Sequence, residues 1–93
     1  MIWGIGSTLI EEMRIVDGKV DIDNFNDYPL LTIGQAPHIE TVLVEAGDGA
    51  PRGVGEPPIG PVAAAIGNAF FALSGVRLRE IPFTPDRVLA ALV

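Results

Sequence analysis

Apolar residues recur along the chain with different spacings, and each spacing predicts a different kind of element. Near the N-terminus, spacings of three and four mark one stripe of an amphipathic helix, formed by Ile2, Ile5, Leu9 and Met13. Two short β-prone runs, residues 14–16 and 19–22, follow it and are joined by Asp17-Gly18. An Asp-Gly pair between such runs predicts a type I′ hairpin.

Side chains that alternate between two faces predict two further strands. In residues 38–45, every second side chain faces the same way, so Ile39, Thr41 and Leu43 share one face. Residues 76–81 alternate in the same manner over a shorter run, which Pro82 ends.

A nearly continuous apolar run occupies residues 62–73, where Asn68 is the only fully polar residue. Pro61 suits the first position of a helix, and Gly75 provides a stop. Thr84 is a suitable N-cap for a last helix ending near residue 92. The pattern as a whole predicts an α+β fold: a small mixed sheet, made of the hairpin and two further strands, packed with three helices, one of them almost wholly apolar.

Composition adds a mismatch between size and hydrophobicity. The chain has 93 residues, enough for a single small domain or a fragment of a larger one. A chain this short buries only about two-thirds of its unfolded surface, yet 48% of its residues are hydrophobic. A helix that is apolar all round must be covered all round. We therefore expect the chain either to self-associate or to dock into something larger.

Charge and residue types exclude several functions. A net charge of −6 argues against binding nucleic acid or anionic membranes. The absence of cysteine excludes disulfides, zinc–thiolate sites and iron–sulfur clusters within this chain. With His38 as the only histidine, no metal site is predicted, and Glu11-Glu12 is interpreted as a solvated helix face. No signal peptide is visible. The uncharged run 57–76 is proline-rich at its start and is predicted to hold a buried helix, not a membrane span.

One loop combines an unusual backbone with a chemical group: Gly53-Val54-Gly55-Glu56-Pro57-Pro58. The glycines allow positive φ or close approach of another group to the backbone, and the prolines stiffen the exit. No lysine follows, so the loop is not a phosphate loop. Glu56 is a candidate general base, and an ordinary structural acid is the alternative that spacing alone leaves open.

The same residues carry a resemblance to a known family. Residues 53–92, GVGEPPIGPVAAAIGNAFFALSGVRLREIPFTPDRVLAAL, combine Gly-x-Gly-Glu-Pro, a Pro/Ala-rich helix and Arg-x-Arg-x-x-Pro. This combination resembles the C-terminal segment of the large, molybdenum-cofactor-binding subunit of the xanthine dehydrogenase family. That family includes aldehyde oxidase and isoquinoline 1-oxidoreductase. Residues 3–12, 25–28 and 37–45 extend the resemblance over nearly the whole chain.

The resemblance implies an oxidoreductase that hydroxylates a carbon of an aldehyde or N-heterocycle with water. The family's Gly-x-Gly-Glu glutamate is its catalytic base, and it falls on Glu56. The backbone of Gly53, Val54 and Gly55 would then face the molybdenum–pterin cofactor. Electrons would leave through iron–sulfur clusters on another polypeptide or domain.

Two explanations for the small size remain open. In the first, the chain corresponds to the C-terminal part of a molybdopterin-binding domain and completes an active site with the rest of the subunit and an iron–sulfur subunit. It would then be inactive alone and would not bind the cofactor alone. In the second, it is a non-catalytic remnant that self-associates or binds a partner as a small domain. The substrate, and a location in cytoplasm or periplasm, are left open.

Overall fold

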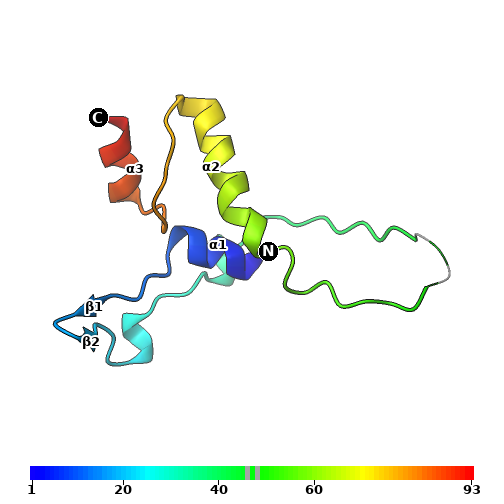
Figure 1. Ribbon diagram of the computed structural model, residues 1–93, viewed down its shortest axis with the longest axis horizontal. Helices are drawn as coiled ribbons and strands as arrows, with labels where there is room; N and C mark the ends of the chain where they lie inside the picture. Colours follow the sequence, from blue (N-terminus) through cyan, green and yellow to red (C-terminus); the bar gives the residue numbers. More distant parts are fainter. Residues whose placement is uncertain (46, 48) are drawn as a thin grey trace.

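A computed structural model describes residues 1–45, 47 and 49–93, and in these ranges the chain is α+β, as predicted (Figure 1). Within the described residues it contains three α-helices and one two-stranded antiparallel sheet. The elements in chain order are α1 (Ile2–Leu9), β1 (Ile15–Val16), β2 (Lys19–Val20), the 3-10 turns η1 (Phe25–Asp27) and η2 (Ile33–Gln35), α2 (Gly60–Ser74) and α3 (Pro85–Leu92).

Helix α1 is shorter than its apolar stripe and packs against α2 through a glycine. It ends at Leu9, before Met13. Gly4 is buried, and a Cβ added there would lie 2.9 Å from Cγ2 of Val62 and 3.1 Å from the carbonyl oxygen of Ile59. The buried Thr8 hydroxyl donates a 2.6 Å hydrogen bond to the Gly4 carbonyl. Gly4 lowers the intrinsic helix propensity, and in exchange it lets the two helices approach closely.

The predicted hairpin is confirmed. Ile15 pairs with Val20 and Val16 with Lys19 in an antiparallel register. Both turn residues have positive φ, 50° at Asp17 and 77° at Gly18, as a type I′ turn requires.

The two further strands are not found. Neither 38–45 nor 76–81 is assigned as strand, so the sheet consists of the hairpin alone. A strand is stabilised by a ladder to a neighbour about 4.8 Å away. Among the described residues, no backbone hydrogen bond joins either segment to another part of the chain. Figure 1 shows residues 38–45 running away from the helices as an extended arm, with residues 49–55 returning beside it.

Helix α2 has the ends that the sequence predicts, and the rest of the described chain buries none of its residues. Pro61 lies in its first turn, and Gly75 at its C-terminus has φ 73° and donates its N–H to the Phe71 carbonyl at 2.8 Å. None of its residues is buried, and Leu73 is 88% exposed. The prediction that this helix is almost wholly apolar is not confirmed by the structure, and the described residues leave its side chains without the cover that an apolar helix needs.

Helix α3 is attached to the end of α1 through its preceding segment. Thr84 caps the helix by accepting the N–H of Arg87. The Arg87 side chain donates to Oε1 of Glu12 at 2.6 Å and to the Pro82 carbonyl at 3.0 Å. Phe83 donates its N–H to the Thr8 carbonyl and is buried. Its ring lies close to Gly67 of α2, so this small contact region links all three helices.

The described chain is far more open than a self-sufficient domain of its size. Its radius of gyration is 16.8 Å, against roughly 12 Å expected for a compact domain of this length. Its accessible surface is 7904 Å², against roughly 5,200 Å² for a compact monomer of this mass. The excess is about half of the expected area, so much apolar surface lacks intramolecular cover.

Candidate functional site

The loop carrying Glu56 leads directly into α2. The Ile59 N–H donates to the Glu56 carbonyl at 2.9 Å, which closes a turn just before Gly60. The Glu56 side chain is exposed. No described residue donates a hydrogen bond or forms an ion pair with its carboxylate. The backbone of Glu56 is thus anchored, while its carboxylate is free to meet a group outside the described chain.

The two glycines of the loop have no explanation within the described chain. Neither Gly53 nor Gly55 has a positive φ, and a Cβ added to either would meet nothing within 4 Å. Of the two reasons the sequence offered for glycine here, positive φ is therefore excluded. Close approach of an external group remains as the explanation, and Val54 between the two glycines is exposed.

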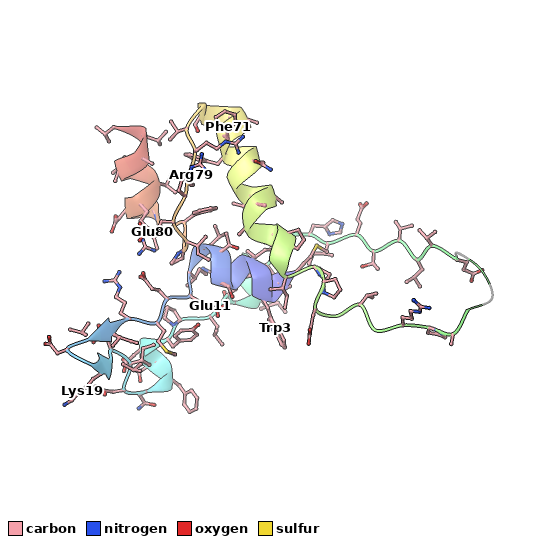
Figure 2. All side chains as sticks on the ribbon, viewed as in Figure 1. Trp3, Glu11, Lys19, Phe71, Arg79 and Glu80 are labelled. Carbon is pink, nitrogen blue, oxygen red and sulfur yellow. The ribbon has the colours of Figure 1, made fainter. Side chains whose placement is uncertain are left out.

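An aromatic side chain lies next to the loop. Gly55, Ile59 and Trp3 line one hollow of about 230 Å³ together with Met1 and Ile2. Trp3 and Ile59 also border a larger groove of about 520 Å³, whose other lining residues are Ile2, Ser7, Glu11, Leu30 and Leu31. Figure 2 marks Trp3 at the start of α1 and Glu11 just beyond its end. Sequence patterns did not place Trp3 beside Gly55, because the two are 52 positions apart and no local pattern links them.

The interpretation of Glu11-Glu12 as a solvated face is wrong. Glu11 accepts a 3.0 Å hydrogen bond from the Tyr28 hydroxyl, and Glu12 pairs with Arg14 at 2.8 Å and Arg87 at 2.6 Å. Both carboxylates hold distant segments against the end of α1.

These contacts also account for the shifted titrations. The hydrogen bond to the Glu11 carboxylate, followed by partial burial, raises the pKa of Tyr28. Hydrogen bonds from Arg14 and then from Arg87 lower the pKa of Glu12.

In residues 1–45, 47 and 49–93, no three or more His, Asp or Glu side chains cluster in a way that could hold a metal ion. His38 lies 3.7 Å from Glu40, and both side chains are largely exposed. No helix in these ranges is long and apolar enough to cross a membrane.

The loop leaves room for a group from outside the described chain. Gly53, Val54 and Gly55 present uncovered backbone, and Glu56 presents an uncovered carboxylate beside it. These groups suit a large polar cofactor approaching from outside. The described residues provide no ligand set for the metal itself.

Comparison with known proteins gives several relatives. No family model matches the chain. It is 38% identical over 91 residues to the membrane-bound aldehyde dehydrogenase (pyrroloquinoline-quinone) of Gluconacetobacter polyoxogenes, covering 98% of this chain and 12% of that protein. It is 40% identical over 92 residues to the putative xanthine dehydrogenase molybdenum-binding subunit of Escherichia coli K12, and the match covers 91% of this chain and 12% of that protein. It is 38% identical over 85 residues to isoquinoline 1-oxidoreductase subunit beta of Brevundimonas diminuta, and the match covers 91% of this chain and 11% of that protein.

These matches define the class of protein. The chain is homologous to a C-terminal segment of the molybdenum-binding subunits of the xanthine dehydrogenase and aldehyde oxidoreductase family, which confirms the family that its motifs indicated. It spans about 12% of the length of the relatives it matches.

Proposed function

We propose that this chain forms the C-terminal part of the active site of a molybdenum hydroxylase, with Glu56 as the catalytic base. The whole enzyme would be an oxidoreductase that hydroxylates a carbon of an aldehyde or N-heterocycle with water. The observation that carries the proposal is the similarity, at 40% identity over 91% of this chain, to a subunit of Escherichia coli K12 that is named as molybdenum-binding. The exposed Glu56 carboxylate at the head of α2 is consistent with it.

The role of Glu56 is to accept, at a carboxylate oxygen, the proton released as a water-derived hydroxyl adds to the substrate carbon. A general base must come within hydrogen-bonding reach of that proton, about 2.6–3.2 Å between heavy atoms. The turn closed by Ile59 holds the backbone of Glu56 at the start of α2. No described residue engages its carboxylate, so it can take up that position without breaking an existing interaction.

Gly53, Val54 and Gly55 would hold the cofactor through their backbone. The absence of side chains on the two glycines lets a bulky group lie against the loop. When bound, the molybdenum–pterin cofactor supplies the redox centre that takes two electrons from the substrate carbon.

Molybdenum is proposed in preference to a quinone. One relative is named for pyrroloquinoline quinone, whereas the relative from Escherichia coli K12 is named as a molybdenum-binding subunit. Metal analysis of the purified complex distinguishes the two.

The chain alone would be inactive and would bind no cofactor tightly. Its candidate loop is open to solvent on the side that a substrate would occupy, and catalysis by a positioned base depends on excluding water from that side. The proposed partners are the remainder of a molybdenum-binding subunit, which supplies the other walls, and an iron–sulfur subunit, which removes the electrons. No nucleic acid is proposed as a partner.

The test replaces Glu56 in the complex purified from the host. Glu56→Gln keeps the size and polarity of the side chain but removes its basicity. We expect kcat to fall by at least about 100-fold, the lower end of what a general base contributes, with molybdenum content unchanged. Asp21→Asn, on the exposed hairpin, is the matched control and should leave kcat unaltered. A Glu56→Gln complex that retains full molybdenum and near-normal kcat would remove Glu56 from the mechanism.

A further inference from the structure

Residues 39–44 form a segment with the sequence of a strand and the backbone of a strand, but with no pairing partner in the described chain. Four of its six residues are β-branched, a composition that favours strands: Ile39, Thr41, Val42 and Val44. The arm is extended in Figure 1, and no backbone hydrogen bond joins it to another described segment.

The last three apolar side chains of this arm face solvent. Val42, Leu43 and Val44 are exposed to 81%, 90% and 81%. Successive side chains of a strand point to opposite faces, so Leu43 lies on one face while Val42 and Val44 lie on the other. Apolar residues on both faces are typical of strands covered on both sides in a larger sheet.

The backbone N–H and C=O groups of the arm also need hydrogen-bond partners once the arm is buried. Every non-proline residue carries one N–H donor and one C=O acceptor, and these are paired when the segment is buried. Covering the apolar side chains without pairing the backbone would leave those groups unsatisfied. A sheet edge meets both requirements together, because main-chain bonds give affinity and alternate side chains enter pockets.

We infer that residues 39–44 bind as an added strand on a sheet edge of the polypeptide that corresponds to the rest of the molybdenum-binding subunit. This inference rests on the proposed function for the identity of the partner. The chain covers only about 12% of its relatives, so nearly nine-tenths of such a subunit lies outside it. Its accessible surface, about half again that of a compact monomer, provides area for such a contact.

A second copy of this chain is the less suitable occupant. The only sheet in the described residues is the two-residue ladder of β1 and β2. A second copy would therefore offer just its own lone arm, and an isolated two-stranded pair is marginal in water. Each copy also brings a net charge of −6, which opposes self-association.

The first test is hydrogen exchange on the complex purified from the host, compared with the free chain. We expect amides within 39–44 to exchange at least about 100-fold more slowly in the complex, as ladder amides do. If no large polypeptide co-purifies, the proposed function and the strand both fail. If the complex forms and α2 gains protection while 39–44 still exchanges at the free rate, only the strand fails. If the free chain dimerises and protects 39–44, the second copy is the occupant and the inference is overturned.

A second test removes single backbone donors. Thr41→Pro and Val42→Pro delete N–H groups that point to opposite sides of the strand. We expect at least one of them to weaken binding of the partner polypeptide by roughly 100-fold. Val42→Ile keeps the N–H, the β-branched shape and the apolar character, and is the matched control. Because the arm makes no hydrogen bond within the described chain, these changes leave the helices intact. Equal, small effects of both proline variants would contradict strand addition.

Discussion

The contact between α1 and α2 gives a sharp prediction, because two helical glycines of this chain should respond in opposite directions to the same substitution. At Gly4, a new Cβ would lie 2.9 Å from Cγ2 of Val62 and 3.1 Å from the backbone oxygen of Ile59. The Val62 methyl group can move, whereas the Ile59 carbonyl belongs to the turn that follows Glu56. At Gly67, a Cβ would lie 3.6 Å from the Phe83 ring, an ordinary contact.

The expected magnitudes follow from two opposing effects. Replacing glycine by alanine inside a helix stabilises it by about 1 kcal/mol, while forcing an extra carbon into a packed contact costs about 1–3 kcal/mol. For Gly4→Ala both apply, and the gain is reduced because Gly4 is in the first turn, so the net change is a destabilisation of about 1 kcal/mol. For Gly67→Ala only the gain applies, which amounts to a stabilisation of up to about 1 kcal/mol.

The assay is thermal unfolding of the purified complex, combined with hydrogen exchange of the α1 and α2 amides. Gly4→Ala should lower the melting temperature and speed exchange in α1, and Gly67→Ala should do neither. Adding Val62→Ala to Gly4→Ala removes the 2.9 Å clash but not the one with the Ile59 carbonyl, so rescue should be partial. If Gly4→Ala proves as stable as Gly67→Ala, the close approach of α1 and α2 is not as described.

Two further predictions concern the titrating groups at the end of α1. Tyr28 is the only tyrosine, and its pKa is raised by its hydrogen bond to Glu11, so ultraviolet titration should place its ionisation above that of free tyrosine, and Glu11→Gln should bring it down. The Tyr28–Glu11 hydrogen bond therefore contributes its full stabilisation below the unfolded pKa of Tyr28, and this stabilisation is lost as pH rises through the folded pKa. An unchanged tyrosine titration in Glu11→Gln would refute the link. The pKa of Glu12 is lowered by Arg14 and Arg87, so its contribution is present above its unfolded pKa and is lost as pH falls through the folded value. Denaturation midpoints measured across that acidic range should fall less steeply in Glu12→Gln than in the parent chain, and equal slopes would contradict the pairing.

Local patterns predicted the elements whose determinants are local. Asp17-Gly18 predicted the hairpin because both residues tolerate the positive φ that the turn requires. Gly75 and Thr84 predicted helix ends because a left-handed C-cap and an N-cap are decided within one turn. The prediction of a strand at 38–45 was wrong for a non-local reason. The side chains do alternate, but a strand needs a second segment to pair with, and the described chain does not supply one.

Contacts between distant residues could not be predicted in this way. Arg87 stands where a capping-box glutamate would be, and nothing local indicates that it reaches Glu12 across 75 positions. A glycine at position 4 lowers helix propensity, and only its distance to Val62 reveals a packing role. For the candidate site, the sequence pattern indicated a lone acid on a Gly/Pro loop and left open whether it is a base or a structural acid. The assignment of Glu56 as the catalytic base came from family resemblance and stays a prediction.

The most direct measurement of the central claim is a native pull-down of the tagged chain from its host, with molybdenum quantified in the eluate. We expect one large polypeptide to co-elute, with molybdenum in a near 1:1 ratio to the chain. An eluate that contains only this chain and no molybdenum would contradict the claim. Glu56 would then be an inherited residue in a small non-catalytic domain.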